Sequence, residues 1–136
     1  MKTFAELGLK EQILNAITEI GYEQPTPVQA AVIPVLLSTE NADDAATTAS
    51  IPTQDIIALA QTGTAAYGLP VLQNVNADDR STQIVILSPT RELCLQISDD
   101  LKDYSRYIDG LHVVAVYGGT GIESQIRQLR KGCQII

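Results

Sequence analysis

Residues 83–93 read QIVILSPTREL, and this stretch decides the fold of the chain. Its first part, 83–88, is a short apolar run without polar alternation, which is typical of a buried β-strand. Residues 89–90 form a turn, and a long amphipathic helix is predicted over 91–108. Apolar residues recur along one face of that helix, at Leu93, Ile97, Leu101, Tyr104 and Ile108. A buried strand followed by a helix is the repeating unit of an α/β domain.

The same alternation extends to both sides of this unit. Further strands are predicted at 55–60, 111–117 and 134–136. Because these runs are apolar throughout, they indicate a parallel sheet with helices on both faces and right-handed crossovers. Such sheets bind ligands beyond the carboxyl ends of their strands. The candidate functional segments are therefore the polar turns at 61–64, 88–91 and 117–121.

The remaining helices are predicted from apolar spacing and capping residues. Thr26 reads as the N-cap of a helix that begins at Pro27, with Gln29 three residues after the cap. Pro34 is placed to kink this helix. Three further helical segments are predicted at 10–20, 65–75 and 122–131.

Residues 38–54 differ in character from the rest of the chain. They are rich in Ala, Ser, Thr, Asn and Asp, carry three acids and no base, and show no apolar period. These features predict an inserted, flexible surface loop. We therefore expect one domain over 1–136, with a segment 1–37 before the insertion and a core over 55–136.

Composition restricts the class of protein. With 45% apolar and 18% charged residues, the chain is typical of a soluble globular domain. No apolar run approaches the roughly 20 residues of a membrane span, and residues 1–9 lack the pattern of a signal peptide, so we expect a cytoplasmic protein without membrane contact. The net charge of -7 argues against a broad basic face for nucleic acid. Cys94 and Cys133 are far apart and His112 is the single histidine, so neither a metal site nor a catalytic triad is assigned.

Residues 21–29 read GYEQPTPVQ, and Phe4 lies 17 residues before Gly21. This pattern resembles the Q motif of DEAD-box RNA helicases, which recognises adenine. The resemblance implies a cofactor pocket in which Tyr22 stacks on the base near Phe4 and Gln29 pairs with the edge of adenine. A carboxamide suits that role because it holds a donor and an acceptor side by side. Taken alone, Gln29 is also explained as a capping-box residue.

Residues 60–64 read AQTGT and resemble the start of the family's phosphate loop, A-x-T-G-x-G-K-T. The resemblance implies cofactor contacts from a short set of residues, Gln61, Thr62, Gly63 and Thr64. The chain continues with AAYG, so Gly-Lys-Thr is missing. In such loops the lysine reaches the outer phosphates and the Thr hydroxyl holds magnesium. The family uses ATP and Mg²⁺, but this loop predicts poor retention of both the phosphates and Mg²⁺. A plain strand-to-helix turn explains 61–64 equally well.

Two further motifs resemble RNA-backbone elements of the same family. Residues 88–93 contain P-T-R-E-L, which implies RNA contacts from Pro89, Thr90 and Arg91. Thr90 would cap a helix whose free amides favour a phosphate, and Arg91 would add a cation. Gly118 and Gly119 resemble the GG motif, a second RNA-backbone element. The alternatives are a capped helix with an exposed Arg–Glu pair and an ordinary glycine turn.

Together the motifs imply a partial, truncated first RecA-like domain, of the P-loop NTPase type, from an ATP-dependent RNA helicase. The 136 residues contain no T-P-G-R, D-E-A-D or S-A-T motif and no second domain, so we expect no catalytic residue in them and an inactive isolated chain. Expected partners are RNA, bound weakly, and the second helicase domain or a complete helicase. Two alternatives stay open: a non-catalytic nucleotide- and RNA-binding module or regulator, and a generic α/β domain such as a flavodoxin-like binder. The Q motif and P-T-R-E-L argue against the generic domain.

Overall fold

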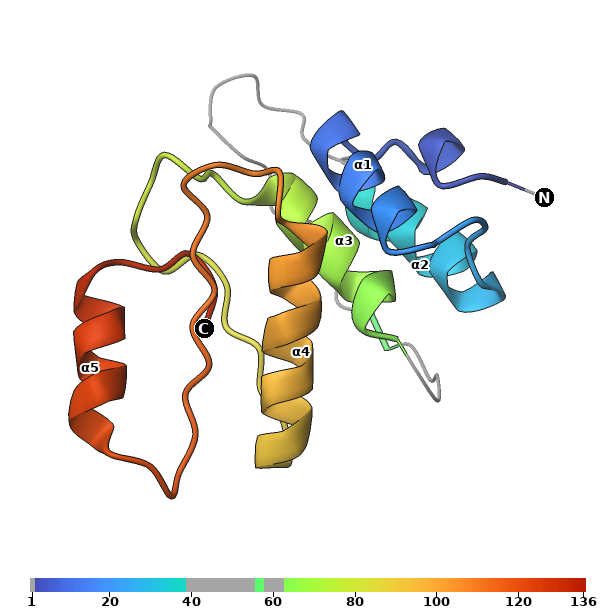
Figure 1. The fold of residues 1–136 in the computed structure, drawn as a ribbon. Coiled ribbons are helices and arrows are strands. Elements are labelled where there is room, and N and C mark those ends of the chain that lie inside the picture. The colour runs from blue at the N-terminus through green and yellow to red at the C-terminus, as the bar shows by residue number, and fades with distance from the viewer. Residues whose placement is uncertain (1, 39–55, 58–62) are drawn as a thin grey trace.

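The computed structural model describes residues 2–38, 56–57 and 63–136. Its helices are η1 (Ala5–Leu7), α1 (Glu11–Glu19), α2 (Pro27–Leu37), α3 (Thr64–Asn74), α4 (Arg91–Tyr104) and α5 (Ile122–Arg130). Figure 1 shows α1 to α4 gathered together, with α5 standing apart beside the C-terminal segment. The predicted helices therefore form close to their expected ranges. The predicted loop 38–54 and strand 55–60 lie almost wholly outside the described residues.

Local side-chain chemistry explains where α2 begins. Thr26 Oγ1 accepts a hydrogen bond from Gln29 N at 3.4 Å, and Gln29 Oε1 accepts one from Thr26 N at 2.9 Å. This reciprocal pair is the predicted capping box, and Pro27 occupies the first turn, where its missing N–H costs nothing. Pro34 lies inside the helix, which continues to Leu37.

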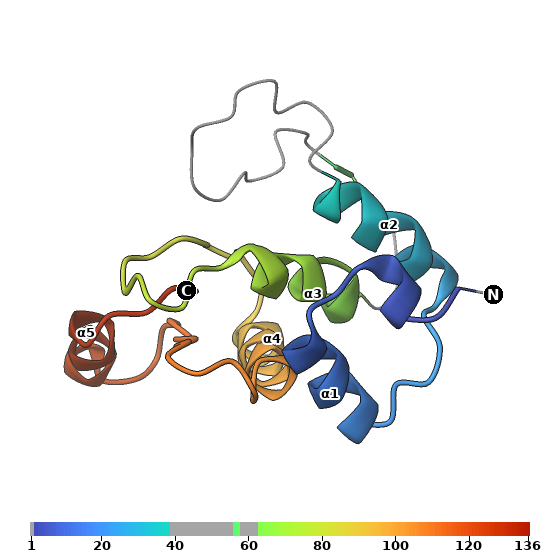
Figure 2. The ribbon, with the colours of Figure 1, turned by 90° about the horizontal axis from the view of Figure 1, so that it is seen from above.

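The hydrophobic core is built around α3, which packs against α1, α2 and α4. Figure 2 shows α3 running between α2 and α4. A Cβ at Gly68 would lie 3.0 Å from Leu101 Cδ2, so a glycine lets α3 and α4 approach closely. The side chains that fill this core are almost fully buried: Ile13, Ile17, Ile33, Leu69, Leu72, Leu101 and Ile135.

The expected parallel sheet is not confirmed. Segment 134–136 lies between 83–86 and 112–114, and two isolated parallel bridges join Ile135 to Ile84 and to Val113. The backbone bonds include Ile86 N to Ile136 O at 2.8 Å and Val114 N to Ile135 O at 3.0 Å. The three segments thus align in parallel without forming continuous strands, because the middle one pairs over only three residues.

Two further expectations need correction. The helix predicted over 91–108 ends at Tyr104, because Ser105 leaves the helical conformation and 105–108 turn back through a bond from Ile108 N to Ser105 O. The expectation of apolar segments covered on both faces is also not confirmed, since Val85, Leu87 and Val116 are exposed. Their neighbours Ile84 and Ile86 pack against the core, so the described part of the chain covers one face of these segments.

Two leucines provide a matched test of this core. Leu69 is fully buried and Leu87 is 90% exposed. We expect Leu69→Ala to lower the free energy of unfolding by about 2–5 kcal/mol, because it leaves a cavity between α3 and its neighbours. Leu87→Ala should change it by no more than about 0.5 kcal/mol. Urea denaturation followed by circular dichroism measures both, and equal losses would contradict the described packing.

Candidate functional site

Tyr22 lies in a cluster of three aromatic side chains. Its ring stacks on Phe4 with centroids 6.0 Å apart and planes 25° apart, and it is tilted against Tyr104 at 5.9 Å. The hydroxyl groups of Tyr22 and Tyr104 are 2.9 Å apart and share a hydrogen bond. Phe4 is only 5% exposed, so it lies behind Tyr22 in the core. Two of the predicted cofactor residues are therefore in contact, with Phe4 supporting the Tyr22 ring.

Tyr104 ends α4 and connects the α4 helix to this cluster. It is only 3% exposed. Burial, and then the hydrogen bond with Tyr22, raise the pKa of the Tyr104 hydroxyl well above its usual range. The group is therefore neutral at ordinary pH, and each hydroxyl can donate or accept in the shared bond. A second link joins the same ends of α1 and α4, because Glu19 accepts a hydrogen bond from Tyr107 and pairs with Arg106 at 3.1 Å.

Gln29 takes part in the capping box described above, so the structure confirms the alternative explanation of this residue as a helix cap. Its Oε1 accepts one hydrogen bond from Thr26 N. A carbonyl oxygen has two lone pairs and the amide nitrogen two N–H donors, so capping leaves hydrogen-bonding capacity on both atoms. The side chain is partly exposed. Capping and ligand recognition are therefore chemically compatible at Gln29.

Only half of the predicted phosphate-contacting segment can be described. Gln61 and Thr62 lie outside the described residues. Gly63 is the N-cap of α3 and makes no side-chain cap, and Thr64 is the first helical residue. The N-terminus of α3 thus presents backbone N–H groups with the positive end of the helix dipole. Both Gly63 and Thr64 are partly exposed.

The N-terminus of α4 carries the predicted P-T-R-E-L residues. Thr90 Oγ1 accepts a hydrogen bond from Leu93 N at 3.2 Å, which confirms Thr90 as the N-cap. Pro89 and Arg91 are exposed beside it. The Arg91 guanidinium lies over the ring of Tyr117, 4.7 Å from its centroid. A cation over an aromatic face is attracted by the ring quadrupole, which gives Arg91 a preferred direction.

The Gly118-Gly119 pair lies next to Arg91. Gly119 has a φ of 83°, and a Cβ there would lie 3.6 Å from Arg91 Nη1. Figure 1 shows the turn before α5 at the same end of the molecule as the N-terminus of α4. The structure thus brings the two predicted RNA-backbone motifs together, although they are more than 20 residues apart in sequence.

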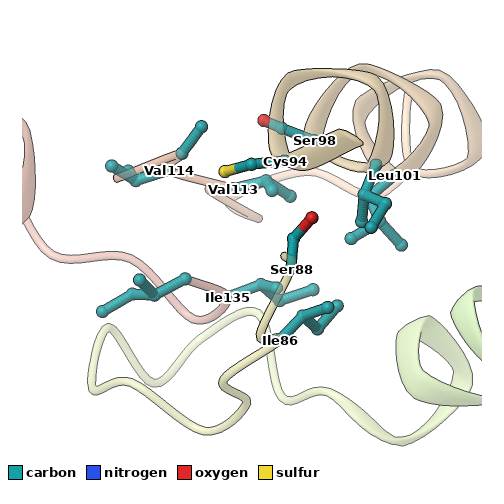
Figure 3. Close-up of a pocket in the computed structure, with 11 residues that line it drawn as sticks. Ile86, Ser88, Cys94, Ser98, Leu101, Val113, Val114 and Ile135 are labelled. Carbon is teal, nitrogen blue, oxygen red and sulfur yellow. The ribbon is translucent and has the colours of Figure 1, made fainter. Parts of the chain in front are cut away.

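A small cavity lies beneath α4, between that helix and the parallel-aligned segments (Figure 3). Its volume is about 20 Å³, and its lining includes Ile86, Leu101 and Ile135. Cavities that take a drug-sized ligand measure roughly 300–1,000 Å³. This cavity is large enough for one water and too small for a base or a ribose, so it is a packing gap and no nucleotide site.

Within the described part of the chain, no group of three or more His, Cys, Asp or Glu side chains could hold a metal ion. In the same residues, no helix is both long enough and apolar enough to span a bilayer.

The profile of the DEAD/DEAH box helicase family matches residues 26–136. This chain belongs to that family. It is 43% identical over 137 aligned residues to the ATP-dependent RNA helicase DeaD of Escherichia coli (strain K12), an alignment that covers 98% of this chain and 20% of that protein. DeaD of Haemophilus influenzae is 35% identical over the same shares. The chain therefore spans about a fifth of the length of these DEAD-box relatives.

Solved structures give the same result for the fold. A DEAD box protein from Methanococcus jannaschii superposes with a TM-score of 0.81 at 34% identity, over 98% of this chain and 34% of that one. The RNA helicase Prp28 from Chaetomium thermophilum, bound to ADP, superposes with a TM-score of 0.78 at 33% identity, over 100% and 31%. Dbp5 of S. cerevisiae, bound to RNA and ADP BeF3, gives 0.74 at 26%, also over 100% and 31%. The DEAD-box resemblance drawn from the motifs is confirmed, and the chain shares the fold of these RecA-like domains, while the parallel sheet is not confirmed in the described residues.

Sequence reasoning missed three residues that contact the candidate site residues or hold the turn between them: Tyr104, Tyr117 and Gln125. Tyr104 was assigned only to the apolar face of a helix, yet its hydroxyl contacts Tyr22. Tyr117 received no role, and Gln125 lies on a helix expected to be merely amphipathic. In the structure Gln125 is buried while Ile122 and Ile126 are exposed, and nothing in the sequence distinguishes Gln125 from its neighbours on this helix.

The tyrosine pair yields an asymmetric prediction. Tyr22→Phe leaves the buried Tyr104 hydroxyl without a partner, so we expect a loss of about 1–3 kcal/mol in unfolding free energy. Tyr104→Phe should cost about 0.5–1.5 kcal/mol, because the partly exposed Tyr22 hydroxyl can bond to water. The double variant should resemble Tyr104→Phe alone.

The same variants carry a pH signature. The pKa of Tyr104 is raised in the folded state, so its contribution is fully present below the unfolded value of about 10 and is lost as pH rises further. Urea unfolding between neutral and alkaline pH should therefore show a smaller alkaline loss in Tyr104→Phe than in the unaltered chain. Identical pH profiles, or additive costs in the double variant, would contradict the hydrogen-bonded pair.

Proposed function

We propose that this chain supplies the adenine-recognising and RNA-backbone-contacting part of an ATP-dependent RNA helicase. This activity is the one named for its relatives, and the chain spans only about a fifth of their length. The observation that carries the proposal is the convergence of Arg91, Tyr117 and Gly119 at the N-terminus of α4. We also propose a cytoplasmic location and association with the remaining helicase segments or with a complete helicase.

The RNA part of the proposal follows from charge and backbone geometry. Arg91 provides a cation, the first turn of α4 provides free N–H groups, and Gly118-Gly119 lets a sugar-phosphate strand approach the backbone. These groups recognise phosphates and carry no base information, so binding should be independent of sequence. The net charge of -7 makes this contact local and weak.

The adenine part assigns the base to the free surface near Tyr22 and its edge to Gln29. Phe4 and Tyr104 hold the Tyr22 ring. A base stacked on an aromatic side chain contributes about 1–3 kcal/mol. Gln29 contributes the remaining lone pair of Oε1 and the N–H groups of Nε2, which together match the donor and acceptor on the adenine edge.

The phosphates and magnesium find fewer binding groups than the base does. Gly63 and Thr64 offer backbone amides and one hydroxyl at the N-terminus of α3, but the sequence lacks the lysine and the Thr of Gly-Lys-Thr. When bound in the family, magnesium neutralises the phosphate charge. The residues described in this chain do not fit a magnesium–triphosphate, so we propose no hydrolytic step. This favours, as the second candidate, a non-catalytic nucleotide- and RNA-binding module or regulator.

RNA binding tests the first part. Arg91→Ala should weaken binding of a short oligouridylate about five- to tenfold, because one charge-assisted phosphate contact is lost. The slope of log affinity against log salt should fall by about 0.7, the value for one phosphate on a single strand. Fluorescence anisotropy over a salt series measures both. Arg130→Ala is the matched control, because Arg130 lies at the C-terminal end of α5, away from Gly118-Gly119. Equal losses of RNA affinity in the two variants would refute the site.

Nucleotide titration tests the second part. Because the outer phosphates lack a cationic partner, AMP and Mg–ATP should bind within about threefold of each other, with no phosphate release in the presence of RNA. Isothermal calorimetry and a phosphate-release assay give these values.

The matched control for adenine recognition lies in the same segment. Gln29→Leu should weaken AMP binding about tenfold, whereas Gln24→Leu, at an exposed position, should not. Mg–ATP binding more than tenfold tighter than AMP, or RNA-stimulated turnover, would overturn the account of the loop.

A further inference from the structure

The turn between Tyr117 and α5 is held by one side chain. Gln125 is 8% exposed and reaches back to the residue at which the turn begins. Its Oε1 accepts a hydrogen bond from Tyr117 N at 3.0 Å, and its Nε2 donates to Tyr117 O at 3.0 Å. Nε2 also donates to Thr120 Oγ1 at 2.8 Å. One amide thus binds both ends of the segment that contains Gly118 and Gly119.

The backbone N–H and C=O of Tyr117 fix the orientation of the Gln125 side-chain amide. A backbone N–H can only donate and a carbonyl can only accept, so Oε1 must face the first and Nε2 the second. Thr120 Oγ1 must then accept from Nε2, which leaves its own O–H free to donate elsewhere. Thr120 is exposed, so this donor can bond to solvent.

The three hydrogen bonds of Gln125, which we call the clamp, also determine where the Arg91 guanidinium lies. Gln125 fixes the backbone of Tyr117, and the Tyr117 ring lies under the Arg91 guanidinium at 4.7 Å. Gly119, within the clamped turn, is also the residue at which a side chain would approach Arg91 Nη1. A continuous series of contacts therefore runs from Gln125 through Tyr117 to Arg91.

We propose that Gln125 is a positioning residue for RNA: by clamping Tyr117 and Thr120 it sets the Gly118-Gly119 backbone and the direction of Arg91 toward one phosphate strand. The inference rests on the proposed RNA-binding function of this surface. Gln125 itself touches no RNA in this account. It acts through the turn, so its loss should alter the phosphate contact of Arg91.

A double-mutant cycle tests this role. Gln125→Met keeps the length of the side chain and removes its hydrogen bonds. We expect oligouridylate binding to weaken about three- to tenfold and the salt slope to fall as in Arg91→Ala, because the cation is no longer aimed at its phosphate. In the Arg91→Ala background the same substitution should cost about twofold or less, since residues that act through one contact are not additive. Gln128→Met, at an exposed position on the same helix, is the matched control and should have no effect.

The outcomes separate the inference from the function on which it rests. If Arg91→Ala weakens binding while Gln125→Met does not, or if their effects multiply, the positioning role is overturned and the RNA surface stands. If Arg91→Ala has no effect, the RNA surface itself is wrong, and the positioning role fails with it.

A second variant covers the case in which Gln125→Met fails to fold by circular dichroism. Thr120→Val, at an exposed position, removes the Thr120 acceptor of the clamp and keeps both bonds of Gln125 to Tyr117. About threefold weaker binding, lost in the Arg91→Ala background, would support the inference. Unchanged binding would overturn it.

Discussion

The packing of α4 on α3 is the contact on which both halves of the site depend. Gly68 gives α3 a surface without a side chain, and Leu101 of α4 fills it. Leu101 and Tyr104 are buried near the end of α4, whereas Arg91 stands exposed at its start, about 20 Å away for a helix of this length. Because a helix is stiff, burial at one end fixes the direction of the other. Tyr104, which contacts the Tyr22 ring, and Arg91, which is proposed to meet RNA, are therefore parts of one rigid helix.

The helices and their caps could be predicted from the sequence because their causes are local. The capping box of Thr26 and Gln29 spans only four residues, and the apolar spacing of α4 depends only on its own turns. A strand is different, because its hydrogen bonds require a neighbouring segment. The apolar run 83–88 was visible, but its partner 134–136 pairs over so few residues that only bridges form at Ile135. For α5 the sequence predicts only a helix, whereas the structure buries Gln125, because its amide satisfies the backbone of a turn, and leaves Ile122 and Ile126 exposed.

In the proposed site, the base and the phosphates of a nucleotide depend on different interactions. Tyr22 and Gln29 offer stacking and hydrogen bonds, which need no net charge and are positioned by neighbours in the described structure. The phosphates need positive charge, and the start of α3 offers only the partial charge of a helix N-terminus, roughly half an elementary charge. A lysine would add a full charge on a flexible stem. In a chain with a net charge of -7, this difference is the reason we propose adenine recognition without retention of the phosphates.

The acidity of the chain also explains why geometry matters at the proposed RNA surface. At physiological salt the field of a charge falls off over about 8 Å, so distant acids weaken binding less than the nearest cation strengthens it. Arg91 is the cation that we assign to this proposed surface, and it lies over Tyr117. One cation contributes only when it faces a phosphate directly, since no broad basic field compensates for a wrong direction. A neutral amide such as Gln125 can therefore govern a charged contact, because it adds no charge and determines where the existing one is placed.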